Sequence, residues 1–168
     1  PFDLMYGGTV FYPVHQNVIW TLLLGLLGIR LMEAARAKGK RWLYVLTCAA
    51  VVVLGFALGT LGMVDYYGAG VLTVFAFYFF RERKWWCLLG QLAALYWLNV
   101  AVLGGQMYPV TLFGREIELC EQGLALLALV PIWLYRGRQG HHSKAFQYAC
   151  YAFYPAHMLV LALLTMIQ

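Results

Sequence analysis

Residues 144–168, KAFQYACYAFYPAHMLVLALLTMIQ, form an apolar stretch that is long enough to cross a bilayer as a helix. The stretch nevertheless contains a histidine, and an ionisable group at membrane depth costs a few kcal/mol. Four polar side chains follow one another at steps of four, three and three residues and therefore share one face of a helix: Gln147, Tyr151, Tyr154 and His157. Pro155 has no N–H, so the carbonyl of Tyr151 needs another partner inside the protein. We interpret this face as the lining of a functional site.

The composition is that of an integral membrane protein. Of the 168 residues, 63% are hydrophobic and 11% are charged, whereas a soluble domain carries roughly 25% charged residues. The long apolar runs predict membrane-spanning helices, because the strands of a membrane barrel alternate in hydropathy. The net charge of +5 fits membrane orientation and contact with acidic lipids or phosphates, so no nucleic-acid partner is predicted. The four cysteines lack metal-ligand spacing, and no metal site is expected.

The chain is predicted to be a single all-α transmembrane domain over residues 1–168. Six apolar runs predict six spanning helices: 17–35, 43–64, 68–80, 85–104, 117–135 and 144–168. The third run is short for a span. Four, three and three of the twelve Lys and Arg residues fall in the alternate connections 36–41, 81–84 and 136–144. The positive-inside rule places these connections in the cytoplasm and therefore places Asn17 and Asp65 at the outer surface.

The phrase Phe-Tyr-Pro-x-His occurs twice, ending at His15 and at His157. The first copy lies in a predicted loop and is interpreted as a surface turn. The second copy lies inside a membrane helix, where a histidine is either a satisfied core group or a group that passes a proton. Asp65 opens a short outer turn, either as a solvated helix cap or as a site residue.

The basic connection 136–144 has two interpretations. Its charged or titratable residues are Arg136, Arg138, His141, His142 and Lys144. Taken singly, each is an ordinary charge that sets membrane orientation. Taken together, they form a suitable binding surface for phosphates on the cytoplasmic side. The two adjacent histidines lack further ligands at useful spacing, so they do not predict a metal ion.

Several phrases together resemble the TraX family of membrane proteins, which is named for the F-pilin acetylase. The phrases are PFDL at 1–4, QNVIWTLLLGLLG at 16–28, DYYGAGVL at 65–72, LYRGRQG at 134–140 and YAFYPAHMLVL at 151–161. They follow the family's order and cover most of the chain, and the last is the most specific. The resemblance implies a multi-pass acyltransferase of the bacterial inner membrane. It also implies further helices before residue 1, with an Asp-His pair and a Gly-Arg-x-x-Phe-Pro phrase.

The resemblance implies acetyl transfer from cytoplasmic acetyl-CoA to an amine on the outer side, on a pilin-like N-terminus or another peptide. Acetyl-CoA binding is then assigned to three arginines and two tyrosines: Arg136, Arg138, Arg81, Tyr151 and Tyr154. His157 acts as general base on the acceptor amine or briefly carries the acetyl group. Asn17 or Asn99 donates to the developing oxyanion, and Asp65 orients a histidine.

Two other classes of function stay open from the sequence. A transporter would use the polar face of residues 144–168 as a substrate or proton path, although no inverted repeat supports that class. A non-catalytic assembly subunit would need only the membrane topology. Such a subunit should tolerate His157→Ala without loss of activity.

Overall fold

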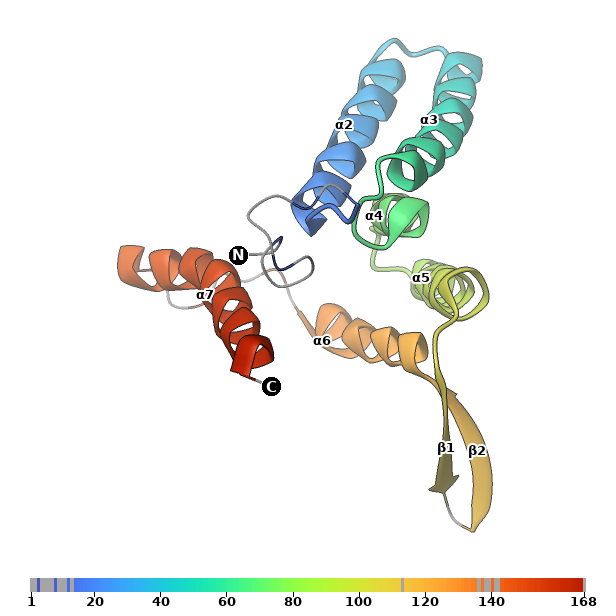
Figure 1. The fold of residues 1–168 in the computed structure, drawn as a ribbon. Helices are drawn as coiled ribbons and strands as arrows, with labels where there is room; N and C mark the ends of the chain where they lie inside the picture. The colour runs from blue at the N-terminus through green and yellow to red at the C-terminus, as the bar shows by residue number, and fades with distance from the viewer. Residues whose placement is uncertain are drawn as a thin grey trace. The chain divides into compact units, whose positions relative to one another are not determined.

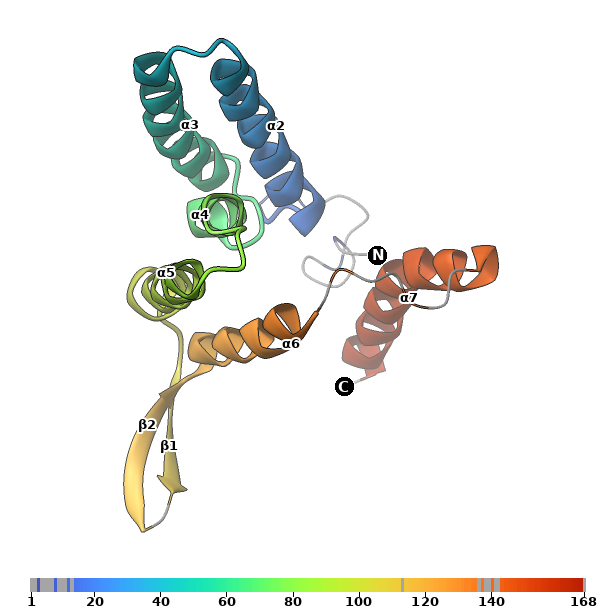
Figure 2. The ribbon, with the colours of Figure 1, turned by 180° about the vertical axis from the view of Figure 1, so that it is seen from behind.

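The fold is mostly helical and forms two compact units (Figures 1 and 2). The computed structural model describes residues 3, 8, 12, 14–112, 114–135, 137, 140 and 143–167. The central unit is Val18–Tyr135, and the terminal unit combines Pro1–Asn17 with Arg136–Gln168. Each unit is described separately below.

Three helices of the central unit are long and apolar enough to cross a membrane. They are α2 (Val18–Ala37), α3 (Arg41–Leu61) and the segment Trp85–Leu103. In this segment α5 (Trp85–Tyr96) continues into the π-helical η1 (Trp97–Leu103). Three of the six predicted spans are therefore candidate spans by length and composition. Two shorter apolar helices are α4 (Tyr67–Phe79) and the pair η2 (Glu121–Ala128) and α6 (Leu129–Leu134). The 13 residues of α4 cover roughly 20 Å, which is less than the hydrocarbon thickness.

Helices α2, α3 and α4 pack together around one aromatic side chain. Phe75 of α4 is 2% exposed and belongs to the main hydrophobic core. It fills the space beside Gly28 of α2 and Gly55 of α3, where an added Cβ atom would lie 2.5 Å and 2.7 Å from its ring. Small residues let helix backbones approach closely, which is the main source of helix packing inside a bilayer.

The connection between α3 and α4 is a tight turn, as the sequence predicted for residues 65–67. Tyr66 and Tyr67 have φ angles of 58° and 50°, in the left-handed region. That conformation costs a non-glycine residue roughly 1–2 kcal/mol, so neighbouring contacts must hold it. The hydroxyl of Thr21 in α2 supplies one contact by donating to the backbone carbonyl of Asp65 at 2.8 Å.

The predicted helix at 117–135 is wrong over residues 117–120, which belong to a strand, and the connection before it contains a second strand. Strand β1 (Met107–Leu112) pairs antiparallel with β2 (Arg115–Cys120). Residues 115–120, REIELC, alternate between charged and apolar side chains, which is the period of a strand. Helical structure begins only at Glu121. In Figures 1 and 2 the hairpin projects away from the helices of the central unit.

The terminal unit contains one long helix, α7 (Lys144–Ile167), with Pro155 inside it. The helix confirms the predicted element at 144–168 to within one residue. Its first turn is capped by Ser143, whose Oγ accepts from the backbone N–H of Phe146 at 3.1 Å. Its 24 residues cover roughly 36 Å.

Candidate functional site

The polar side chains of α7 lie in contact along one face of the helix. Gln147 Nε2 donates to the hydroxyl of Tyr151 at 2.9 Å. One turn further, the rings of Tyr154 and His157 meet edge to face with centroids 5.4 Å apart. The hydroxyl of Tyr154 donates to Asn17 Oδ1 at 3.2 Å. The terminal unit therefore brings together Asn17, Tyr154 and His157, three of the predicted site residues.

The ring of His157 is held in one orientation by the preceding turn. Its Nδ1 lies 2.9 Å from the backbone carbonyl oxygen of Phe153, and its ring stacks on the Phe153 ring at 5.0 Å. A carbonyl oxygen can only accept a hydrogen bond, so Nδ1 carries the proton in this contact. In the neutral ring Nε2 then carries the lone pair. His157 is half-buried, and its geometry suits a base or a nucleophile that acts through Nε2.

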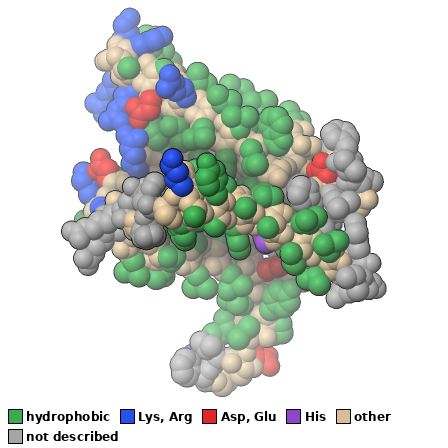
Figure 3. Space-filling model, turned by 90° about the vertical axis from the view of Figure 1, so that its left-hand side faces the viewer, with side chains coloured by type: hydrophobic (Ala, Val, Ile, Leu, Met, Phe, Trp, Pro, Cys, Tyr) green, Lys and Arg blue, Asp and Glu red, His purple; other side chains and the backbone are tan. Residues whose placement is uncertain are grey.

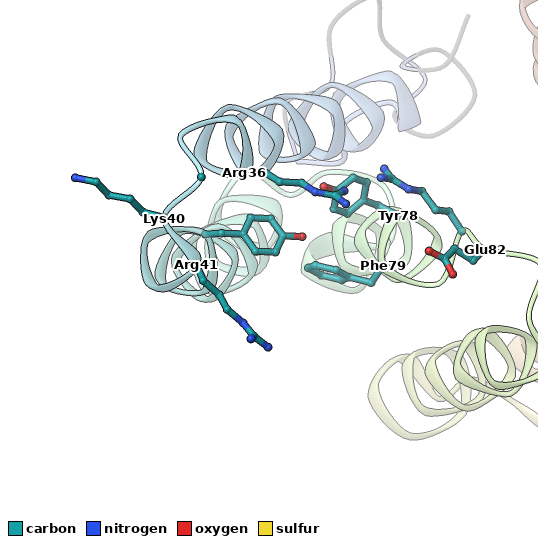
Figure 4. Close-up of a pocket in the computed structure, with 9 residues that line it drawn as sticks. Arg36, Lys40, Arg41, Tyr78, Phe79 and Glu82 are labelled. Carbon is teal, nitrogen blue, oxygen red and sulfur yellow. The ribbon is translucent and has the colours of Figure 1, made fainter.

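The central unit contains a basic pocket of about 380 Å³ at the C-terminal ends of α2 and α4 and the start of α3 (Figure 4). Its lining residues are Arg36, Gly39, Lys40, Arg41, Tyr44, Tyr78, Phe79, Arg81 and Glu82. Four of these side chains are cationic, and they come from two of the three connections predicted to be cytoplasmic. In Figure 3 Lys and Arg side chains gather where α2 connects to α3, beside the hydrophobic side chains of the helices.

One carboxylate organises the cations of this basic pocket. Glu33 Oε1 accepts from the hydroxyl of Tyr78 at 2.7 Å and from Arg81 Nη1 at 3.1 Å. Arg36 Nη1 lies 3.7 Å from the same oxygen, and the Arg81 guanidinium sits 4.8 Å from the centre of the Tyr78 ring. The hydrogen bond to Glu33 raises the pKa of Arg81 above its ordinary value, so Arg81 stays charged.

The side chains of the Glu33–Arg81 pair are 41% and 52% exposed. Exposed ion pairs contribute about 0–1 kcal/mol to stability. The main effect of Glu33 is therefore to orient Arg81. Figure 4 shows Arg36 directed toward Tyr78, whereas Lys40 extends away from the pocket.

A second, apolar pocket of about 350 Å³ lies among α2, α4, the α5–η1 segment and the η2–α6 segment. Its lining is mostly aliphatic, with uncharged polar residues interspersed: Thr21, Tyr66, Thr73, Asn99 and Gln122. Asn99 is buried in the π-helical η1 and donates through Nδ2 to the carbonyl of Leu95 at 2.9 Å. π-Helical turns occur frequently at functional sites. Asn99, predicted from the sequence as an alternative oxyanion donor, lines this cavity of the central unit.

The remaining predicted site residues fall in different places. Tyr151 lies on α7 with the polar face already described, and Arg81 lines the basic pocket. Asp65 stands in the α3–α4 turn of the central unit, where its backbone carbonyl is bonded to Thr21. Arg136 and Arg138 lie outside the described residues, as do His141 and His142. Within the described ranges, no three His, Cys, Asp or Glu side chains gather closely enough to hold a metal ion.

Sequence reasoning missed the organising residues of the basic pocket. It treated Arg36, Lys40 and Arg41 only as orientation charges and did not single out Glu33 or Tyr78. One local signal was available, since Glu33 and Arg36 stand three residues apart and so share a helix face. Tyr78 gave no signal, because an aromatic residue in an apolar run also fits lipid contact.

Comparison with known proteins gives one match. The model of the TraX protein family matches residues 1–165. No curated protein and no solved structure matches the chain. The matched range includes α2 to α6 and α7 through Thr165, so both the α7 polar face and the basic pocket fall within it.

Proposed function

Because the chain belongs to the TraX family, we propose that it is a membrane-embedded acetyltransferase of the bacterial inner membrane. Its donor is cytoplasmic acetyl-CoA, and its acceptor is an amine on the outer side, on a pilin-like N-terminus or another peptide. The observation that supports this chemistry is the fixed ring of His157, which bonds through Nδ1 and leaves the lone pair on Nε2. An ionisable side chain inside an apolar membrane helix costs a few kcal/mol of insertion free energy, so such a residue usually has a function.

In the proposed reaction, Nε2 of His157 removes a proton from the acceptor amine as the amine attacks the acetyl carbonyl, and the C–S bond breaks with CoA thiolate leaving. Alternatively Nε2 attacks the acetyl carbonyl first and CoA thiolate leaves. The amine then attacks the carbonyl of the acetylated ring, the bond to Nε2 breaks, and Nε2 takes the amine proton. Asn17, whose Oδ1 accepts from the Tyr154 hydroxyl beside His157, is proposed as a donor to the oxyanion, with Asn99 as the alternative. Asp65 is assigned to orienting a histidine, and Tyr151 and Tyr154 to contact with the pantetheine.

The donor's phosphates are proposed to bind in the basic pocket. Guanidinium groups suit phosphates because they offer paired N–H donors, and Arg81 and Arg36 meet there. Tyr44 and Phe79 add aromatic surface on which an adenine can stack. The volume of about 380 Å³ falls in the range of small-molecule sites. Arg136 and Arg138 are proposed to contribute further cationic contacts.

This function requires a particular membrane arrangement. We infer that α4, the η2–α6 segment and α7 complete six spans together with the three long apolar helices. The basic pocket then faces the cytoplasm, where acetyl-CoA is found, because its cations lie in connections that follow the positive-inside rule.

The test of the proposed function is acetyl transfer by His157 variants. His157→Ala should lower transfer of labelled acetyl from acetyl-CoA to an amine peptide by ~10²–10⁴, with acetyl-CoA binding unchanged. His157→Gln should be nearly as inactive, because glutamine cannot accept the proton. His15→Ala, at the other copy of the motif, is the matched control and should resemble the wild type. Near-normal turnover by His157→Gln would leave this residue structural and would assign the chemistry to other residues.

A further inference from the structure

The β1–β2 hairpin has one mainly apolar face and one face that carries two carboxylates. Side chains of directly opposed residues point to the same side of an antiparallel pair. The pairs Tyr108↔Leu119 and Val110↔Ile117 thus share one face, together with Arg115, which pairs with Leu112 at the tip and adds a charged side chain to that face. The alternating pairs place Thr111 and Pro109 with Glu116 and Glu118 on the other face, which ends at the base in Met107↔Cys120. The four side chains of the pairs Tyr108↔Leu119 and Val110↔Ile117 are between 37% and 49% exposed.

The base of the hairpin is fixed at the end of the α5–η1 segment, which is long and apolar enough to cross a membrane. η1 ends at Leu103, and β1 begins four residues later. Gly104 and Gly105 have φ angles of 67° and 117°, which permit the sharp exit from the helix. The base is closed by the thiol of Cys120, which donates to the Gly104 carbonyl, and by the backbone N–H of Glu121, which donates to the Gln106 carbonyl.

An isolated two-stranded hairpin is marginal in water, so its apolar face needs cover. The hydrocarbon core is excluded as its position, because both hairpin edges carry backbone groups that lipid tails cannot satisfy. The lipid–water boundary satisfies both requirements, since it covers apolar side chains and still hydrates backbone groups. Tyrosine is enriched at that boundary, and the glutamates disfavour contact with anionic headgroups.

We propose that the β1–β2 hairpin lies on the membrane surface, with Tyr108, Val110, Ile117 and Leu119 in the boundary between headgroups and acyl chains. Glu116 and Glu118 face water. The partner is the zwitterionic lipid surface next to the end of η1. In this proposal the apolar face binds neither another protein nor a second copy of this chain. The proposal does not depend on acetyl transfer.

The test compares two neighbouring positions on opposite faces of β2. In the full chain without native cysteines, Ile117→Cys and Glu118→Cys carry an environment-sensitive fluorophore. Each protein is placed singly in a phosphatidylcholine nanodisc, and thermal unfolding confirms that both variants are folded. The Ile117→Cys label should emit at shorter wavelength and be quenched by lipid nitroxides near the headgroups. The Glu118→Cys label should instead be quenched by aqueous iodide.

Each other result overturns the proposal. Equal iodide quenching at both positions means that the hairpin stands in water. Strong quenching only by nitroxides at the end of the acyl chain places the hairpin in the hydrocarbon core. Protection of the Ile117→Cys label from both quenchers means that protein covers this face. If protection from iodide requires two copies per disc, the face is a contact between copies.

Discussion

Two pockets of the central unit have similar size and opposite chemistry. The basic pocket, about 380 Å³, uses the C-terminal ends of α2 and α4, and the apolar pocket, about 350 Å³, uses the N-terminal part of α2 and the side of α4 that carries Gly70, Thr73 and Phe77. In the apolar pocket the polar groups are uncharged, and Thr21, Thr73 and Asn99 each donate to a backbone carbonyl. Charge inside a bilayer is expensive. The comparison teaches that charged side chains line the pocket at the ends of these apolar helices, whereas uncharged polar groups bonded to the backbone line the pocket between their apolar parts.

The largest expected effect is on the dissociation constant for acetyl-CoA, which should depend on the basic pocket and not on the apolar pocket. Arg36→Ala combined with Arg81→Ala should weaken binding about 100-fold, because charge-assisted hydrogen bonds contribute about 1.5–3 kcal/mol each. The dependence of affinity on salt should also decrease. Thr73→Val, in the apolar pocket, should leave the dissociation constant unchanged. Calorimetry on purified protein measures all of these.

Arg83→Ala is the matched control for those substitutions, because Arg83 lies in the same connection as Arg81 and does not line the pocket. It should bind acetyl-CoA like the wild type. A similar loss in Arg83→Ala would mean that general positive charge attracts the donor, and the basic pocket would no longer be its site.

A smaller effect is expected from the packing of Phe75 against α2 and α3. Gly28→Ala places a methyl group 2.5 Å from the Phe75 ring, so it should destabilise the fold by about 1–3 kcal/mol. The midpoint of thermal unfolding should fall by roughly 2–4 °C for each kcal/mol. Adding Phe75→Leu should restore part of the loss, because the smaller side chain makes room.

Gly123→Ala tests whether that loss comes from crowding. An added Cβ atom at Gly123 meets no atom nearer than 3.7 Å, so this variant should unfold like the wild type. If Gly28→Ala is equally harmless, α2 and α4 can move apart to accept the methyl group, and close packing of Phe75 against Gly28 is not required.

The smallest expected effect is that of Tyr78→Phe, which removes the hydroxyl bonded to Glu33 and keeps the ring beneath Arg81. A hydrogen bond contributes about 1 kcal/mol, so acetyl-CoA affinity should fall about fivefold. Thr21→Val removes a comparable bond at the other end of α2 and should change stability without changing this affinity. An unchanged affinity in Tyr78→Phe would show that Glu33 holds Arg81 in place without the Tyr78 hydroxyl.

The sequence predicted those features that depend on local patterns. Apolar length located α2, α3 and the α5–η1 segment, and the turn at Asp65 followed from its break in hydropathy. The hairpin was missed because the long apolar run after residue 117 outweighed the short alternation in REIELC. The contacts of Glu33 with Tyr78 and Arg81 join residues 45 and 48 positions apart. Only the packing of α2 against α4 creates those contacts.

The Glu33 carboxylate has a consequence for ligand selection. It acts as a built-in counter-ion, because it already occupies donors of Arg81 and Tyr78. An anion that enters the basic pocket must replace this carboxylate or share its donors. A singly charged anion gains little from such an exchange, whereas a ligand with several phosphate charges can engage the outer cations at the same time. The pocket therefore selects anions by valence, and common monovalent anions should compete poorly for it.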